Sequence, residues 1–434
     1  MNGSSDCTVL LGQVPVADIN RLGGWSFSMK YRDSWLDDSR AFPLSPCLPL
    51  DGSFGPDAVY AFFENMLPEG RALDILSQTN AISKRHVLDL ALALGNDLPG
   101  AVRLHKADSK EQSQSQVFRP IEPTEIIQRL EQPDFFPMSV WDGKPRLSVA
   151  GIQTKINVLK RGDTYGLADG PDIASNAILK FESASQRHLL LNEHLCMEFA
   201  KSLGHPVAQT RLIRFGSHRA LEVMRFDRRV TASAVARIHT IDGCQALGLP
   251  SAYKYERQFG DSRDVAFIRD GASLKRLFGL SCLQNPIAAW DNLLDWVLFN
   301  LIIGNSDAHG KNYSFFGSNQ GFRPTPWYDL VSVRMIPGVA HSLAMSVGDE
   351  FDPEAVHALQ LLYLADDASL TKKFAATHLN RVLKLASQAL ATLGRTIADP
   401  TEEERAFVER FKTWMQKSLA YWSEQARILP ELSL

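Results

Sequence analysis

The sequence has few cysteines, no excess of charge of either sign and no long uninterrupted hydrophobic run. Its five cysteines are an odd number among 434 residues, and they show neither the paired spacing of a zinc site nor that of a disulfide framework. The chain starts without the basic and apolar regions of a signal peptide. Together these absences predict a protein of the reducing cytoplasm.

The longest apolar run, around Trp290 to Ile303, is interrupted by Asp291, Asp295 and Asn300. Such a run is too polar for a membrane span, so we interpret it as a core helix and expect no membrane association. Forty-six basic residues stand against 49 acidic ones, which gives a net charge of -3. This balance excludes a global basic field that would attract nucleic acid, so any contact with DNA would have to be local or made through a partner.

The length and composition are those of a soluble globular protein with two or three domains. Hydrophobic residues make up 45% of the chain and charged residues 22%, well away from disordered or fibrous classes. The alternation of Trp25 to Met29 after Gly23 and Gly24 predicts a hairpin near the start. From about Asp57 to Leu94 the apolar residues recur at helical spacing, with a break at residues 68–70. A small α+β subdomain over residues 1–105 is therefore expected.

The polar, low-complexity residues 106–116 are the best linker candidate, and we place a linker at residues 106–120. Short apolar strands follow at residues 156–159 and 177–181, so residues 121–230 are expected to form a second α+β region. Helical periodicity dominates beyond Asp352. Residues 231–434 are therefore expected to form a helical lobe.

The segment from Leu298 to Phe316 carries the strongest chemical signal. An apolar run ends at Gly304, and a polar loop with Asp307, His309, Lys311 and Asn312 follows. Four residues separate the aspartate from the asparagine, the spacing of a kinase catalytic loop, in which the aspartate orients the attacking hydroxyl and the asparagine holds a metal.

Asp329 supplies a second carboxylate shortly after this loop. Mg²⁺ prefers oxygen ligands and keeps water and substrate phosphates, so one asparagine and one aspartate suffice as its protein ligands. The segment predicts a phosphotransfer site. The alternative is a polar surface loop whose aspartate and asparagine only cap turns.

Two lysines are further candidates for phosphate contacts. Lys155 follows a small, glycine-containing stretch at residues 148–154, in which backbone N–H groups could approach an anion. Lys180 is the only charged residue in an apolar strand, which suits either a nucleotide-phosphate contact or a lysine that reaches the surface with its ammonium group. The sequence contains neither a Walker A motif nor a GxGxxG motif.

These motifs together resemble the HipA family, the toxin kinases of bacterial HipBA-type toxin–antitoxin modules. The resemblance runs nearly from end to end and is carried by residues 62–70, 98–102, 148–155, 225–228, 244–248, 304–312 and 328–329. It implies a two-lobed α+β, protein-kinase-like fold with a small N-terminal α+β subdomain and an all-helical C-terminal lobe. It also implies a serine/threonine kinase that uses ATP and Mg²⁺.

The resemblance assigns a role to each matching position. It implies that Asp307 is the catalytic aspartate and that Asn312 and Asp329 are metal ligands. The nucleotide contacts that it implies are Lys155, Lys180, Gln153, Gln245, His309 and Phe226. Met224 stands where relatives often have a glutamate, which leaves the hinge contact to backbone atoms.

The resemblance further implies a HipB-like helix-turn-helix antitoxin as partner and DNA contact only through it. The implied substrate is a protein such as glutamyl-tRNA synthetase, an aminoacyl-tRNA synthetase whose phosphorylation would arrest growth and lead to persistence. Two alternatives stay open. One is a protein that acts mainly as a co-repressor on its antitoxin, and the other is a small-molecule or lipid kinase, whose loops residues 304–309 also resemble.

Ser148 opens the stretch before Lys155, and in HipA-like kinases the serine at this position is phosphorylated by the kinase itself. Phosphoserine carries a charge of about -1.5 to -2, so it would repel bound ATP or displace the loop. Autophosphorylation at Ser148 is therefore expected to inhibit. The alternative is a solvated turn residue before a strand.

Overall fold

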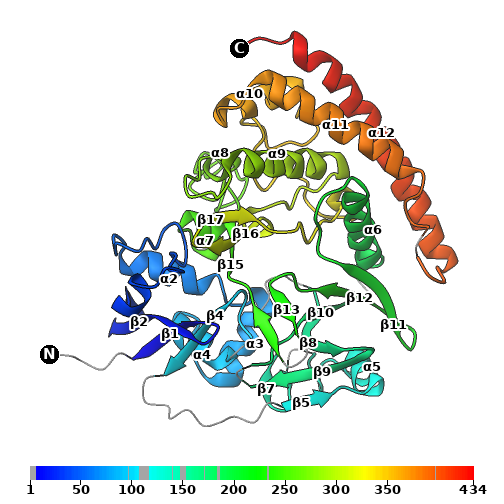
Figure 1. The fold of residues 1–434 in the computed structure, drawn as a ribbon. Helices are drawn as coiled ribbons and strands as arrows, with labels where there is room; N and C mark the ends of the chain where they lie inside the picture. Colours follow the sequence, from blue (N-terminus) through cyan, green and yellow to red (C-terminus); the bar gives the residue numbers. More distant parts are fainter. Residues whose placement is uncertain are drawn as a thin grey trace. The chain divides into compact units, whose positions relative to one another are not determined.

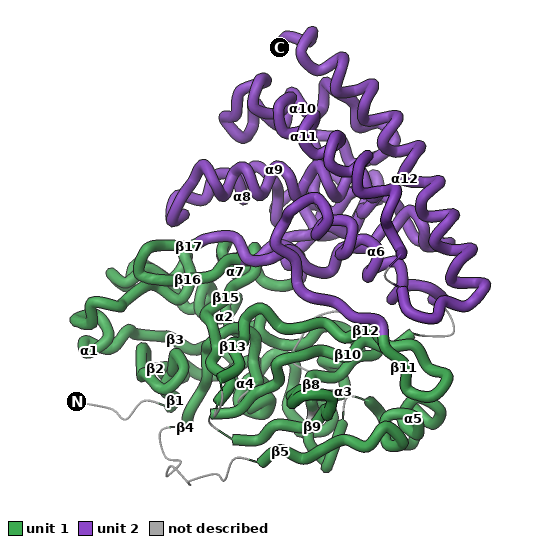
Figure 2. The backbone as a smooth tube through the Cα atoms, turned by 45° about the vertical axis from the view of Figure 1, so that its right-hand side comes forward, with its two compact units in different colours: residues 1–183, 213–251, 315–322 green, residues 184–212, 252–314, 323–434 purple. Residues whose placement is uncertain are grey.

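The computed structural model describes residues 6–95, 97–106, 117–138, 140–146, 153–170, 172–182, 186–231, 234–395 and 397–434. The chain divides into two compact units, and each is assembled from three separate segments (Figure 2). Unit 1 consists of residues 1–183, 213–251 and 315–322, and unit 2 consists of residues 184–212, 252–314 and 323–434. The units are discontinuous in sequence, unlike the consecutive domains expected from the sequence.

Unit 1 begins with an antiparallel sheet in the order β3-β2-β1-β4. Its strands are β1 (Cys7–Leu11), β2 (Val14–Gly23), β3 (Ser26–Tyr31) and β4 (Val102–Lys106). The predicted hairpin is confirmed, because β2 pairs with β3 across a turn at Gly23 and Gly24, whose positive φ angles of 105° and 58° favour glycine. The helices of this region are α1 (Asp33–Leu36), α2 (Pro56–Glu64), α3 (Gly70–Asn80) and α4 (Val87–Leu94) (Figure 1).

A second sheet of unit 1 has the order β11-β12-β10-β8-β9-β5. Its strands are β5 (Val117–Pro120), β8 (Lys155–Arg161), β9 (Thr164–Asp169), β10 (Ala177–Phe181), β11 (Thr210–Phe215) and β12 (His218–Met224). The helix α5 (Pro123–Glu131) and the short strands β6 (Val140–Trp141) and β7 (Lys144–Pro145) accompany it. Its core contains Trp141, Ile156, Leu179 and Phe181, all nearly inaccessible to solvent. The last four residues of the predicted linker are therefore strand β5, and residues 107–116 of that linker lie outside the described residues.

The prediction of an all-helical lobe over residues 231–434 is wrong, because this range also contains strands. These strands are β14 (Val235–Arg237), β15 (Thr240–Asp242), β16 (Ser314–Ser318) and β17 (Gly321–Pro324). Strand β14 pairs with β13 (Arg228–Val230), and β15, β16 and β17 form a three-stranded sheet. The helix α7 (Gly243–Leu247) follows β15. These strands are only three to five residues long, too short to show a period of two against the helical segments around them.

Unit 2 is mainly helical, and α9 (Pro286–Ile303) is a long helix with most of its residues buried. The other helices are α6 (Leu189–Ser202), α8 (Leu274–Phe278), α10 (Ala358–Asp367), α11 (Lys372–Leu390) and α12 (Glu402–Ile428), with 3-10 turns η1 (Ser251–Tyr253), η2 (Gly310–Asn312), η3 (Val333–Met335) and η4 (Leu429–Glu431). Among the described helices, α9 has the length and apolar composition of a membrane-crossing helix, but 61% of it is buried inside the protein. It also contains the buried Asp295, whose carboxylate accepts from His378 and Arg381. These contacts agree with the predicted core helix.

Candidate active site

Helix α9 leads directly into the predicted catalytic loop. It ends at Gly304, which has a φ of +67° and caps the helix in the left-handed conformation. A Cβ atom at this position would lie 2.9 Å from the Cβ of Arg334 and 3.1 Å from the Trp414 ring. Both the positive φ and the close contacts with Arg334 and Trp414 require glycine at position 304. The same residue therefore ends helix α9 and sets where the loop begins.

A relay of side-chain amides connects α9 to Asp307. Asn300 donates to the carbonyl oxygen of Trp296, and its own side-chain oxygen accepts from Nδ2 of Asn305 at 2.7 Å. Oδ1 of Asn305 in turn accepts from the backbone N–H of Asp307 at 3.2 Å. Asn300 and Asn305 are buried, so these bonds satisfy polar groups that would otherwise be costly and set the position of the loop backbone.

The loop brings Asp307 and Asn312 together as the spacing predicts. Nδ2 of Asn312 donates to the carbonyl oxygen of Asp307 at 3.0 Å, and the backbone N–H of His309 donates to the same oxygen at 2.8 Å. Asn312 and His309 are buried, whereas the Asp307 side chain is exposed. The Asp307 side chain therefore lies on the exposed side of the loop, and the side-chain oxygen of Asn312 is the amide atom not used in this bond.

The segment that ends at Asp329 is bonded to the catalytic loop at several points. The phenol of Tyr328 donates to the carbonyl oxygen of Lys311 at 2.5 Å and lies 2.5 Å from Oγ of Ser314. Asp329 itself has a φ of +55°, an uncommon conformation for a residue other than glycine. Such backbone strain often occurs at functional sites, and here it falls on a predicted metal ligand.

Asn292 of α9 joins the two segments that carry the predicted metal ligands. Its Oδ1 accepts from the phenol of Tyr313 at 2.9 Å and from the indole Nε1 of Trp327 at 3.0 Å. Tyr313 directly follows Asn312, and Trp327 lies two residues before Asp329. One oxygen on a core helix therefore sets the positions of both segments. This role of Asn292 was not predicted, because the residue lies in a run interpreted only as apolar core.

The donor set fits Mg²⁺ by its chemistry. An amide oxygen from Asn312 and a carboxylate from Asp329 are hard oxygen ligands, and Mg²⁺ takes few of these from a protein in kinase sites. In the part of the chain that the structure describes, no group of three or more His, Cys, Asp or Glu side chains is placed to hold a metal ion. A metal in this site would therefore depend on phosphate oxygens and water for its other ligands.

In unit 1, the two predicted phosphate-binding lysines are direct neighbours. Lys155 of β8 and Lys180 of β10 stand opposite each other in the antiparallel register, and both are buried. Opposite residues on neighbouring strands project from the same face of the sheet, so the two ammonium groups share one face. Gln153 lies just before β8 and is partly exposed. Ser148 lies outside the described residues.

Gln245 has a structural role that the sequence did not indicate. It completes a capping box with Asp242 at the start of α7, and its Nε2 donates to the carbonyl oxygen of Phe62 at 2.9 Å. Its contact with nucleotide stays a prediction. Phe226 is partly buried and packs edge-on against Phe316, with ring centroids 5.9 Å apart.

The motif at residues 225–228 is an internal ion cluster. The carboxylate of Asp227 accepts from both Arg225 and Arg228 and from the backbone N–H of Gly100, and Arg228 also donates to the carbonyl oxygens of Leu98 and Gly100. Burial alone would raise the pKa of Asp227, but the two guanidinium groups outweigh it and hold that pKa well below its usual range. The cluster joins the two motifs at residues 98–102 and 225–228.

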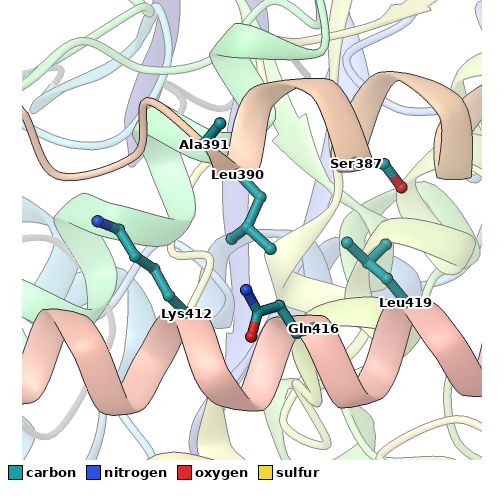
Figure 3. A pocket seen from close by; sticks show the side chains of 6 residues that line it. All are labelled: Ser387, Leu390, Ala391, Lys412, Gln416 and Leu419. Atoms are coloured by element: carbon teal, nitrogen blue, oxygen red, sulfur yellow. The ribbon is translucent and has the colours of Figure 1, made fainter.

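A groove of about 400 Å³ lies between α11 and α12 of unit 2 (Figure 3). It is lined by Ser387, Leu390, Ala391, Lys412, Gln416 and Leu419. None of these residues belongs to the catalytic loop or to the segment before Asp329, so the groove is separate from the candidate site.

Comparison with known proteins agrees with this geometry. Residues 7–105 match the HipA N-terminal domain family, and residues 147–390 match the HipA-like C-terminal domain family. The chain is 43% identical to the serine/threonine-protein kinase toxin HipA of Shewanella oneidensis, over 89% of each protein. It is 32% identical to the putative kinase Y4mE of Sinorhizobium fredii, over 73% of this chain and 75% of that protein.

A solved structure extends the comparison to the fold. The Shewanella oneidensis MR-1 toxin–antitoxin complex of HipA, HipB and operator DNA contains a chain that matches with a TM-score of 0.90 and 39% identity, covering 99% of this chain and 100% of that one. The fold and the relationship to a named kinase together define a kinase-like phosphotransferase. The chain belongs to the HipA family and is a HipA-type serine/threonine-protein kinase toxin.

Proposed function

We propose that this kinase transfers the γ-phosphate of ATP to a protein hydroxyl with Asp307 as the catalytic aspartate. The observation that carries the proposal is that the Asp307 side chain is exposed on a loop whose backbone is held by the buried Asn305 and Asn312. The carboxylate accepts the hydrogen bond, and then the proton, of the attacking hydroxyl. The hydroxyl oxygen bonds to the γ-phosphorus, and ADP leaves.

Asn312 and Asp329 are the proposed ligands of Mg²⁺, which would neutralise charge on the phosphates. Lys155 and Lys180 are the proposed phosphate contacts, supported by their opposed positions on β8 and β10. Gln153, Gln245, His309 and Phe226 complete the proposed nucleotide contacts. The side chain of Gln245 already accepts from the backbone N–H of Asp242 and donates to the carbonyl oxygen of Phe62. A nucleotide contact would therefore use the second N–H of its amide or the second lone pair of its oxygen.

The proposed substrate is an aminoacyl-tRNA synthetase, with glutamyl-tRNA synthetase as the first candidate, and its phosphorylation would stop tRNA charging and arrest growth. Purified chain, glutamyl-tRNA synthetase and radiolabelled ATP test this directly, with the Asp307→Ala variant as control. Label on the synthetase that depends on Asp307 is expected. Phosphoproteomics of cells expressing either form then identifies other substrates, and equal phosphorylation by both forms would rule out the assigned site.

We propose a HipB-like helix-turn-helix antitoxin as the partner through which the chain reaches DNA. The complex of the Shewanella relative with HipB and operator DNA and the net charge of -3 support this. In a gel shift at about 0.15 M salt, the chain alone is expected to leave operator DNA unshifted and to supershift the antitoxin–DNA band. Tight sequence-specific binding by the chain alone would contradict the proposal.

Autophosphorylation at Ser148 is proposed as an inhibitory step, supported by the sequence match alone. The reaction would occur between molecules, since a segment that cradles ATP in its own site is badly placed to present its hydroxyl in line with the γ-phosphate. Intact-mass measurement is expected to show one added phosphate on active protein and none on the Asp307→Ala variant. Phosphorylated protein that binds ATP as well as the unmodified form would refute the inhibitory role.

A further inference from the structure

The carboxylate of Asp307 already has a hydroxyl bound to it. The phenol of Tyr255 donates to Oδ1 of Asp307 at 2.8 Å, within unit 2 and across 52 positions of sequence. Tyr255 is 37% exposed and Asp307 is exposed as well. Water could solvate both groups, so the bond is not needed to satisfy buried polar atoms. A role in stability therefore explains this contact poorly.

The backbone on both sides of Tyr255 is fixed to its surroundings. The carbonyl oxygen of Lys254 accepts from the backbone N–H of Gly310 at 2.9 Å, so this segment is bonded to the catalytic loop itself. The backbone N–H of Glu256 donates to Ala344 at 2.9 Å, and the buried Glu256 side chain holds Arg269 and Ser346. Only rotation of its own side chain can move the Tyr255 hydroxyl away from Asp307.

The neighbouring ring contact favours this one orientation. The Tyr255 ring stands edge-on to the ring of the buried His309, with centroids 5.3 Å apart and an angle of 88° between the planes. Edge-to-face packing is a favoured arrangement of aromatic rings. The phenol is thus held at the Asp307 carboxylate by contacts that a side-chain rotation would break.

We propose that the Tyr255 hydroxyl occupies the position of the acceptor hydroxyl in the resting kinase and is displaced by the serine or threonine of the substrate. This inference rests on the proposed role of Asp307. A protein substrate must donate its hydroxyl to the same carboxylate, and a phenol is the same type of donor at the same distance. While Tyr255 is in place, a water molecule cannot take up that position.

The consequence is protection of ATP from wasteful hydrolysis. In hydrolysis, a water oxygen forms a bond to the γ-phosphorus, the bond from that phosphorus to the bridging oxygen breaks, and ADP leaves. The water proton passes to Asp307 and then to solvent. With the phenol on Oδ1 of Asp307, a water molecule loses that oxygen as the acceptor that would orient it. Removal of the phenolic oxygen should therefore increase ATP hydrolysis.

The test measures initial rates of phosphate release from Mg²⁺-ATP by the full chain without any protein acceptor. Tyr255→Phe keeps the ring against His309 and removes only the hydroxyl. It is expected to raise the rate of hydrolysis by about 2- to 13-fold, the factor that corresponds to the loss of one hydrogen bond of about 0.5–1.5 kcal/mol. Tyr253→Phe, two residues earlier in the same segment, is the matched control and should leave the rate unchanged.

A double variant, Asp307→Ala with Tyr255→Phe, should not show the increased rate of ATP hydrolysis. A water molecule in the position that the phenol leaves needs the Asp307 carboxylate to orient it. A purely structural role for Tyr255 predicts a lower or unchanged rate in Tyr255→Phe, and either result would overturn the inference. Failure of the proposed function itself would look different: Asp307→Ala alone would then still phosphorylate protein.

Discussion

Two motif segments of this kinase, residues 225–228 in unit 1 and residues 304–312 in unit 2, differ in how they use charge. In the first, Arg225, Asp227 and Arg228 are all buried, and the two guanidinium groups pair with the carboxylates of Asp227 and Asp97. In the second, the carboxylate of Asp307 is exposed while the amides that position it are buried. Both segments carry the family resemblance, yet the first one forms a buried ion cluster, whereas the second one contains the proposed catalytic aspartate. The burial of the aspartate side chain therefore distinguishes the two segments, whereas the presence of a family motif does not.

The largest expected effect comes from removing the exposed carboxylate. Asp307→Ala should reduce phosphotransfer by about 10²- to 10⁴-fold, the usual contribution of a positioned acid or base. Because the Asp307 side chain and its hydrogen-bond partner Tyr255 are both exposed, the unfolding midpoint should hardly change. Asp261→Ala, at an exposed aspartate of the same unit, is the control and should leave activity intact. Rate assays and thermal melts on the same preparations separate a loss of phosphotransfer from a loss of stability.

The reverse result is expected for the buried carboxylate of the first segment. Asp227→Ala removes the nearer carboxylate from two buried guanidinium groups and leaves them Asp97 at 3.5 Å, and the loss of one partner from a buried ion pair typically costs about 3–5 kcal/mol of unfolding free energy. Urea unfolding should show this loss, whereas Asp38→Ala, at a solvent-exposed ion pair with Arg40, should leave the midpoint unchanged. An Asp227→Ala variant as stable as the parent protein would remove the contrast between the segments.

A buried histidine in unit 1 makes the stability of that unit depend on pH. Burial lowers the pKa of His239 to about 4, only partly offset by the hydrogen bond from its Nε2 to the carbonyl oxygen of Leu44. At pH values below the unfolded-state pKa of about 6.5, His239 binds a proton in the unfolded chain but stays neutral in the folded protein. The free energy of unfolding therefore falls as pH decreases from about 6.5 to 4, by about 2 kcal/mol at pH 5.

Urea unfolding at pH 7 and pH 5 measures this dependence. His239→Gln keeps a donor for Leu44 and removes the titrating group, so the difference in unfolding free energy between the two pH values should shrink by that amount. The catalytic segment of unit 2 should not contribute to it. An unchanged difference in the variant would place the pH dependence elsewhere.

The smallest expected effect concerns Asn292, which acts on the site only through Tyr313 and Trp327. Asn292→Leu removes the acceptor of two hydrogen bonds, at a cost of about 1–3 kcal/mol. The Mg²⁺ concentration for half-maximal activity should rise several-fold, because the segments of both metal ligands lose their common anchor. Asn292→Asp keeps an acceptor oxygen and should restore most of the Mg²⁺ response, whereas a purely structural role would change stability without moving it.

Local patterns predicted much of this architecture. The hairpin at Gly23 and Gly24, the helices between residues 56 and 94, and the helix that ends at Gly304 follow from turn chemistry and periodicity, which act over a few residues. The spacing of Asp307 and Asn312 likewise predicted that they share one loop, and the bond from Asn312 to the Asp307 carbonyl agrees.

Contacts across long sequence separations could not be predicted in this way. Nothing near Asp307 indicates that Tyr255 bonds to it, and nothing near Asn292 indicates two partners from later segments. Gln245 shows the same limit, since its amide bonds to Phe62, 183 positions away. The strands β14 to β17 were missed because three to five residues carry too weak a period. Side-chain hydrogen bonds of this kind depend on the finished fold, which one sequence does not reveal.

The interleaving of the two units has a consequence for synthesis on the ribosome. Unit 1 includes residues 315–322, so it lacks one of its own segments until more than 300 residues have been made. Unit 2 lacks α10, α11 and α12 at that moment, because these helices come later in the chain. A nascent chain that is released early would therefore leave both units incomplete, so that incomplete translation products of this toxin should be inactive and easily degraded.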